Sequence, residues 1–190
     1  QQASETYKVV KQRTNALTFA LRRESILNEV MSAIRESLDY SNMLSTIVQT
    51  VGRTFTATEG ILWPVAGDRL ISKPIYYKSP ETIENNFLIT EELLLPVVQS
   101  RQTYFEKGSN KNSCKVIIPL IYQQDLLAVL ALNQQKSSNF WSFEDIEFIE
   151  SVLEQVALAL SQAKLYQRTR ELAEQMRNEL EVARQIQSNL

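Results

Sequence analysis

The stretch Lys115-Val-Ile-Ile-Pro-Leu-Ile-Tyr-Gln-Gln-Asp-Leu-Leu-Ala-Val-Leu-Ala-Leu132 decides the fold of this chain. Two almost continuously apolar runs, 115–122 and 126–132, flank the polar triplet 123–125, which is the composition of two strands joined by a tight turn. Strands that are apolar at nearly every position are covered on both faces. The stretch therefore predicts two central strands of a sheet, with further structure packed above and below them.

Sequence on both sides of this hairpin extends the pattern. The runs 60–65 and 69–77 are β-rich and are joined by Ala66-Gly67-Asp68, which favours another hairpin, and Tyr104-Phe105 predicts a short strand. Glu91–Ser100 has helical character despite Pro96. Downstream, Ser142-Phe-Glu-Asp145 is typical of a capping box, in which the serine hydroxyl and the aspartate carboxylate satisfy amides at a helix start.

Both flanks of the chain predict long helices. The four glycines and five prolines all lie between Gly52 and Pro119, so no strong helix breaker interrupts either flank. From Ser142 onward a continuous helix would be about 74 Å long, at about 1.5 Å per residue. Apolar residues in 1–38 recur at helical spacing, and Asp39-Tyr-Ser-Asn42 interrupts them before a second helix at about 42–56. We therefore predict an α+β fold with a mixed or antiparallel sheet.

Composition excludes several classes of function. The net charge of −2 and the lack of a long apolar run argue against nucleic-acid or membrane partners. With one cysteine and no histidine, the chain lacks the parts of a zinc site, a cysteine–histidine pair or a histidine-ligated haem. The single Cys114 fits a reducing cytoplasm, where we expect it to be a small buried residue. We therefore expect no metal site and no catalytic residue in this chain. The first residue is Gln1 and not methionine, which suggests that the chain is a piece of a longer protein.

The late hairpin, together with Trp141-Ser-Phe-Glu-Asp-Ile-Glu-Phe-Ile149 and Leu153-Glu-Gln-Val-Ala-Leu-Ala-Leu160, resembles the signature of GAF domains. This resemblance implies a domain over residues 25–164, with a central antiparallel or mixed sheet, helices on one side of it, and long flanking helices. Bilin-binding members carry a cysteine before the late strands, usually followed by histidine. This chain has no histidine, and its single cysteine, Cys114, lies at the start of a predicted strand. Cyclic-nucleotide-binding members carry Asn-Lys and Phe-x3-Asp-Glu, where this chain has Asn133-Gln134 and Trp141 followed by Asp145-Ile146.

A different small ligand stays possible, because aromatic residues gather in the segments that would cover the ligand side of a GAF sheet. The alternative is that these rings fill that half of the domain without any ligand. The candidate pocket residues are Trp63, Tyr76, Phe87, Tyr104 and Phe105.

The two helical arms, residues 1–24 and 165–190, carry apolar rows that predict a homodimer. Alternating spacings of three and four are typical of a coiled-coil seam. The seam residues are Val10, Leu17 and Leu21 in the first arm, and Leu165, Thr169, Leu172, Met176, Ala183, Ile186 and Leu190 in the second, where Glu179 breaks the row. An upstream row, Ile149, Leu153, Val156, Leu160 and Ala163, has the same spacing in another register, so a stutter is expected near 163–165. Parallel pairing is the leading arrangement, antiparallel pairing stays open, and the alternative is a helix packed on its own domain.

The last twelve residues add a second resemblance. Glu179-Leu-Glu-Val-Ala-Arg-Gln-Ile-Gln-Ser-Asn-Leu190 is similar to the segment that enters the catalytic domain of bacterial PPM-type serine/threonine phosphatases of the sporulation and stress-response branch. It implies that Ala183, Arg184, Ile186 and Gln187 are an output motif, and that manganese or magnesium would bind only in the phosphatase domain itself. The expected function is a regulatory sensory module that controls such a phosphatase in bacterial signal transduction. The alternative is a small-molecule-sensing module coupled to a histidine kinase or a nucleotide cyclase.

Overall fold

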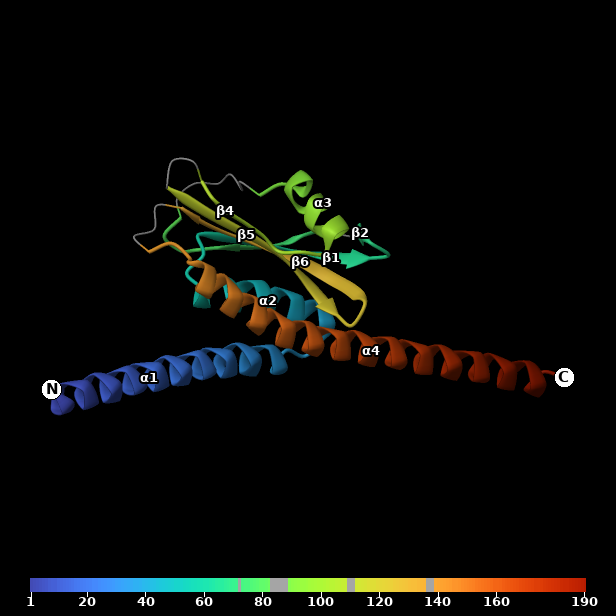
Figure 1. The fold of residues 1–190 in the computed structure, drawn as a ribbon. Coiled ribbons are helices and arrows are strands. Elements are labelled where there is room, and N and C mark those ends of the chain that lie inside the picture. Colours follow the sequence, from blue (N-terminus) through green and yellow to red (C-terminus); the bar gives the residue numbers. More distant parts are fainter. Residues whose placement is uncertain (72, 83–88, 109–111, 136–138) are drawn as a thin grey trace.

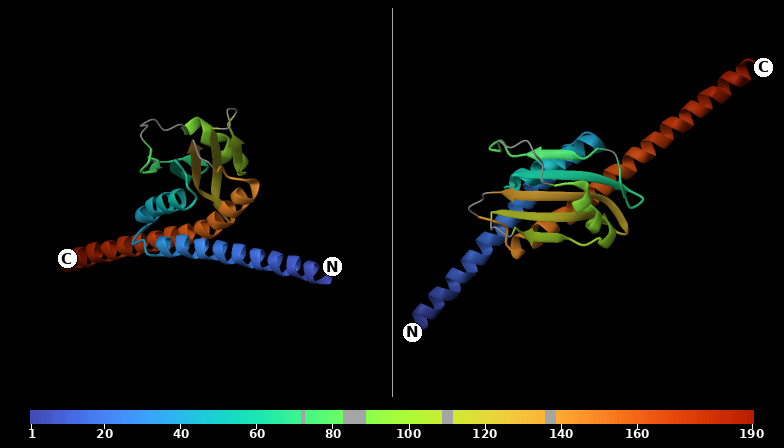
Figure 2. Two further views of the ribbon diagram at one scale, coloured as in Figure 1. Left: turned by 90° about the vertical axis from the view of Figure 1, so that its left-hand side faces the viewer. Right: turned by 90° about the horizontal axis from the view of Figure 1, so that it is seen from above.

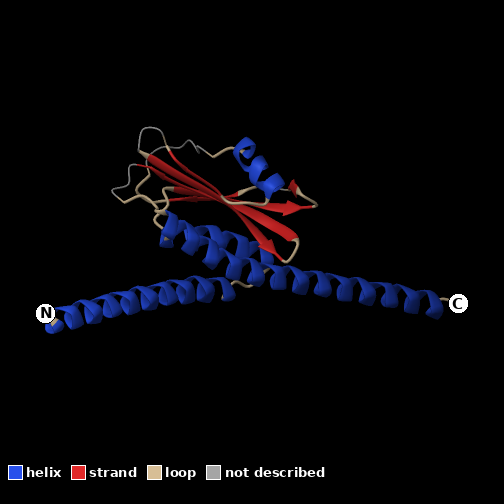
Figure 3. Ribbon diagram, in the orientation of Figure 1, coloured by secondary structure: helices blue, strands red, loops and turns tan. Residues whose placement is uncertain are grey.

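The computed structural model of the chain describes residues 1–71, 73–82, 89–108, 112–135 and 139–190. Four helices and six strands follow one another in these ranges (Figures 1 and 3). They are α1 (Gln2–Arg35), α2 (Tyr40–Thr54), β1 (Glu59–Ala66), β2 (Arg69–Leu70), β3 (Ile75–Lys78), α3 (Glu91–Ser100), β4 (Tyr104–Lys107), β5 (Ser113–Tyr122), β6 (Asp125–Gln135) and α4 (Phe143–Ser188). The predicted α+β architecture with long terminal helices is confirmed.

The sheet is antiparallel throughout, in the order β2-β1-β6-β5-β4, and β3 also pairs with β1. The predicted hairpin forms its centre, because β5 and β6 pair along their whole length and each has a second neighbour. Their register shifts between Leu120 and Ile121, where Leu127 is the extra residue of β6. Such a bulge bends the strand locally. Here it turns Leu127 and Ala128 toward the same core.

Two apolar cores cover the two faces of the sheet, as the continuous apolar character of β5 and β6 predicts. On one face, Leu62, Val116 and Leu130 pack with side chains of α2 and α4. Helix α1 lies on the side of these two helices that faces away from the sheet (Figure 1). On the other face, Ile61 and Val129 pack against α3. The expectation of helices on one side only is therefore wrong in this detail. A sheet whose central strands are apolar on both faces needs a cover on each face. Helix α3 covers the second face with Leu94, Val97 and Val98.

Local signals fix where the main helices start. The Ser142 hydroxyl accepts a hydrogen bond from the Asp145 amide at 3.2 Å, and an Asp145 carboxylate oxygen accepts from the Ser142 amide at 2.8 Å. This confirms the predicted capping box. Asp39 caps α2 by accepting a hydrogen bond from the Asn42 amide at 2.7 Å. Gly52 allows α2 to approach β3 closely, because a Cβ atom there would lie 2.3 Å from the Tyr77 ring.

The arms leave the domain in opposite directions, and the two termini lie at opposite ends of the molecule in every view (Figures 1 and 2). The Arg23 guanidinium joins α1 to α4, since its central carbon lies 4.3 Å from the centroid of the Phe19 ring and 4.8 Å from that of Phe148. Cation–π contacts of this kind are attractive. Neither arm, nor any other helix in the described ranges, is both long and apolar enough to cross a membrane.

The upstream row of α4 is not a second coiled-coil seam, which corrects the sequence-based expectation. Ile149, Leu153, Val156 and Leu160 are buried against the domain's own sheet and α2, and Ala163 packs at the edge of this core. A helix packed on a sheet and a helix in a coiled coil share the same spacing of three and four, so spacing alone cannot tell them apart. The change of register near 163–165 marks the point where α4 leaves its domain.

Candidate ligand-binding face and output surface

One face of the sheet, the side that carries α3, gathers three of the predicted pocket residues. Directly paired residues of antiparallel strands point to the same side. Tyr76, Ile61, Ala131, Ile117 and Tyr104 are paired in turn from β3 to β4 and form one row across the sheet. Trp63 lies on the same side, two residues beyond Ile61 in β1. The two tyrosines thus stand at the two ends of an apolar row.

A polar row runs beside this apolar row and was not predicted from the sequence. Its members, again paired strand by strand, are Lys78, Glu59, Asn133, Lys115 and Glu106. Glu59 and Asn133 are only 4% and 1% exposed, and the Asn133 side-chain amide donates a hydrogen bond to a Glu59 carboxylate oxygen at 3.1 Å. They lie 74 positions apart in the sequence, so only the strand pairing brings them together.

Two buried polar atoms on this face have no hydrogen-bond partner among the described residues. One is the side-chain oxygen of Asn133, and the other is the indole nitrogen of Trp63, whose ring packs beside the α3 core. Most buried polar atoms in proteins have a partner, so orphaned ones require an explanation. The pair offers one acceptor and one donor to a molecule that reaches this face.

The other predicted pocket residues are placed differently. Phe105 points to the opposite face, where it makes an edge-to-face contact with Phe143 at 5.5 Å between ring centroids. Phe87 lies outside the described residues. The Tyr104 hydroxyl donates a hydrogen bond to Glu106 at 3.0 Å, and this bond raises the pKa of Tyr104. Tyr76 and Tyr104 are both half-exposed at the margins of the face.

Cys114 is fully buried in the core on the α4 side, and burial raises the pKa of its thiol. Because the thiolate is the nucleophilic form, this environment suppresses its reactivity at neutral pH. In the described ranges no group of three or more histidine, cysteine, aspartate or glutamate side chains is arranged to hold a metal ion.

The arms carry the second candidate surface. Exposure changes abruptly along α4, from 0% at Leu160 to 67% at Leu165, and every seam residue of both arms is exposed. The two apolar rows of α4 are offset by two positions, or roughly 200° around the helix, so the seam faces away from the domain's own core. The output residues Ala183, Arg184, Ile186 and Gln187 are exposed on the same arm.

Two threonine hydroxyls on the arms, one at the seam position Thr169 and one at Thr14, between Val10 and Leu17, are already satisfied inside their own helices. The Thr14 hydroxyl donates to the Val10 carbonyl, and the Thr169 hydroxyl donates to the Leu165 carbonyl, both at 2.9 Å. Covering these threonines would therefore leave no donor without a partner. Farther along α4, a shallow groove is lined by Gln175, Asn178, Glu179, Val182, Ala183 and Ile186.

Comparison with known proteins agrees with this geometry. The profile of the GAF domain family matches residues 22–160, and the chain belongs to that family. The structure resembles the GAF domain of a phosphoenolpyruvate-protein phosphotransferase from Acinetobacter, with a TM-score of 0.59 and 14% identity over 77% of this chain and 98% of the other. It also resembles the phycocyanobilin-bound GAF domain of a cyanobacterial phytochrome, with a TM-score of 0.55 and 16% identity over 76% of this chain and 96% of the other.

Among curated proteins, the chain is similar to hybrid signal transduction histidine kinase G of Dictyostelium discoideum. The two are 29% identical over 76 residues, which is 40% of this chain and only 2% of the kinase. The family identifies the chain as a GAF regulatory and sensory module of signal transduction. A module of this class regulates an effector and is not itself catalytic.

Proposed function

We propose that this chain is a dimeric GAF module that controls an attached PPM-type serine/threonine phosphatase in the bacterial cytoplasm. The observation that carries the proposal is the exposed seam on both arms. Apolar residues at coiled-coil spacing line helices that protrude from the domain, with no covering surface from the described parts of the same chain (Figure 1). A second copy of the chain, paired in parallel along both arms, covers these apolar residues. The paired arms then form a rod that extends from the domain at both ends.

The seam has the composition expected for a pair of helices. Tyr7, Val10, Thr14, Leu17 and Leu21 follow spacings of three and four in α1, and the α4 seam repeats that pattern from Leu165. No charged residue interrupts the α1 row between Tyr7 and Leu21. Glu179 does interrupt the α4 row and weakens pairing there. Around such a position the two helices have two packings of similar energy, so a small input can shift the output end of the arm from one packing to the other.

The phosphatase is proposed from the motif at 179–190, and its identity can be tested by reading the residues that follow Leu190 in the full-length protein. We expect Leu-Pro, an apolar strand and an aspartate-rich turn that holds the catalytic metal ions. A histidine-containing helical segment in that place would instead make the effector a kinase. The kinase is the second candidate because of the similarity to the Dictyostelium hybrid histidine kinase.

The input of the module is proposed to be a small molecule on the α3 side of the sheet. The orphaned Asn133 oxygen would accept a hydrogen bond from it, and the Trp63 indole would donate one to it. The resemblance to a phycocyanobilin-bound GAF domain shows the fold alone, so the proposal rests on these two atoms.

We expect native mass spectrometry of the protein, purified from the organism that makes it, to show a mass above that of the polypeptide. Asn133→Leu should abolish this extra mass because it removes the acceptor while filling the space with an apolar group. Gln167→Leu, on the exposed arm, is the matched control and should retain it. A polypeptide mass alone in the wild-type protein, under conditions that preserve noncovalent complexes, would contradict a bound ligand.

A further inference from the structure

Three tight turns meet at one end of the sheet, on the side where α4 leaves the domain. Four non-glycine residues in the described ranges have left-handed backbone angles, and three of them lie in these turns: Asp68 (φ 59°), Arg101 (φ 57°) and Gln123 (φ 56°). Arginine and glutamine adopt this conformation only at a cost, so surrounding contacts must hold it. The bulge at Leu127 lies beside the same turns.

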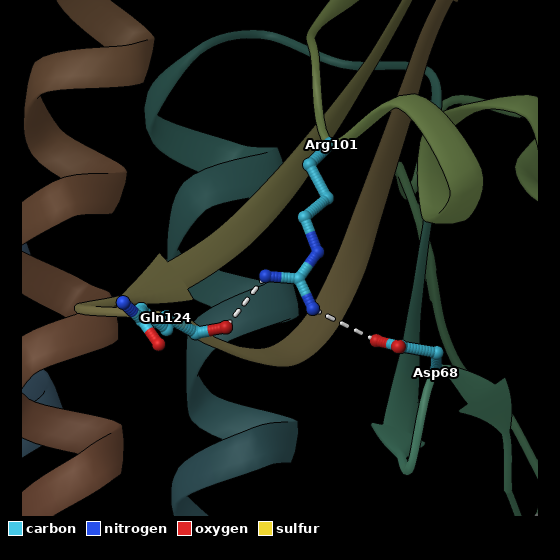
Figure 4. Close-up of polar contacts among 3 residues, drawn as sticks. All are labelled: Asp68, Arg101 and Gln124. Carbon is cyan, nitrogen blue, oxygen red and sulfur yellow. Dashed lines mark hydrogen bonds and ion pairs between the residues drawn. The ribbon is translucent and has the colours of Figure 1, made fainter.

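Arg101 is the residue that holds these turns together (Figure 4). Its backbone amide donates to the Val97 carbonyl at 2.8 Å and so closes the C-terminus of α3. One guanidinium nitrogen donates to the Gln124 carbonyl in the β5–β6 turn at 2.5 Å. A second one donates to the Asp68 carboxylate in the β1–β2 turn at 2.9 Å. A single side chain thereby fastens the end of α3 to both hairpins.

The bonded turns face the point where α4 departs. A cleft of about 460 Å³ separates them from the helix, and it is lined by Asp68, Arg101 and Asp125 on one side and by Ser161, Lys164 and Arg168 of α4 on the other. The same stretch of α4 contains the change from the buried row to the exposed seam. At its other end α3 is anchored in the second core through Leu94, which is fully buried among sheet residues of the proposed ligand side.

We propose that Arg101 is the positioning residue that transmits a displacement of α3 to the departure point of α4. A shift of α3 moves the guanidinium, which moves the two turns and so changes the wall that α4 passes at 161–168. Helices α3 and α4 pack on opposite faces of the sheet. The shortest connection between them therefore runs around the end of the sheet, where the turns lie. This inference rests on the proposed function, in which α3 covers the ligand side and α4 carries the output.

Amide hydrogen exchange on this chain tests the inference without a ligand or an effector. Leu94→Ala is the input, because it opens a cavity under α3 and leaves the α4 core untouched. We expect exchange of the amides at 161–164 to become at least about fivefold faster, the lower end of coupling between sites in allosteric proteins. In an Arg101→Gly background the same replacement should leave those amides unchanged. Glycine is chosen because it tolerates the left-handed angle, so only the side chain is lost.

Asp125→Ala is the matched control, since Asp125 lines the cleft but does not bond to Arg101, and the response to Leu94→Ala should persist in it. If Leu94→Ala prevents folding, Val98→Ala supplies a smaller cavity under the same helix. An equal response with and without Arg101, or no response in the wild-type background, overturns the inference. The amides at 161–164 precede the seam, so the result is independent of whether the arms dimerise or which effector follows them.

Discussion

Replacing Leu172 and Met176 with glutamate is expected to convert the dimer into a monomer. In the paired arms, two leucines and two methionines leave water, and each is worth about 1.5–3 kcal/mol when fully buried. At the lower value the four side chains together contribute about 6 kcal/mol. Loss of only half of this contribution, about 3 kcal/mol, weakens association by about 100-fold. Four glutamates in adjoining layers also repel one another. Light scattering coupled to gel filtration measures the result directly.

The domain itself should be unaffected, because both residues lie far along an exposed arm, with exposed fractions of 52% and 64%. Gln167→Glu together with Gln185→Glu is the matched control, since it adds the same charge at exposed positions off the seam and should leave a dimer. A dimer that survives Leu172→Glu with Met176→Glu would show that this arm does not hold the two copies together.

A single cysteine at Leu172 then separates the two possible orientations. Parallel, in-register arms place residue 172 of one copy against residue 172 of the other, so oxidation should link them covalently. Antiparallel arms would place it against α1 of the second copy, and no such link would form. The experiment has a low background because native Cys114 is fully buried and burial raises the pKa of its thiol.

Features set by residues close in sequence were predictable. The capping box at Ser142 needs only four consecutive residues, and the central hairpin needs only its own apolar runs and turn. Helix α3 was expected over the range that it occupies, but its face was not, because which side of a sheet a helix crosses depends on the whole topology. The β-rich run 69–77 forms two separate strands, with Pro74 immediately before the second. Proline lacks the amide that a continuous strand would use.

The candidate site was predictable only in part. Aromatic content indicated Trp63, Tyr76 and Tyr104, which share one face, but it also indicated Phe105, which alternation along β4 sends to the other. No sequence signal could pair Glu59 with Asn133, because the strands that carry them are joined only through the register of the sheet. Periodicity likewise gave equal weight to both rows of α4, although one is core and the other is exposed.

Inserting one residue after Tyr166 in the full-length protein is expected to change the activity of the attached effector strongly. In a continuous helix, one added residue rotates everything downstream by about 100° and advances it by about 1.5 Å. Leu172, Met176 and Ile186 then no longer share a face with Leu165, so the arms cannot pair in their original register. The output residues beyond Glu179 would be presented in a new orientation.

The size of the insertion distinguishes rotation from mere lengthening of the helix. Seven added residues extend the arm by more than one residue does, yet they restore the seam to within about 20° of its original face. If α4 transmits a change of register, the seven-residue insertion should leave effector activity near the wild-type level while the one-residue insertion alters it. Circular dichroism should show intact helix in both proteins. Equal activity in the wild-type protein and the one-residue variant would mean that α4 is a passive tether, and the signal would then have to reach the effector by direct contact with the GAF domain.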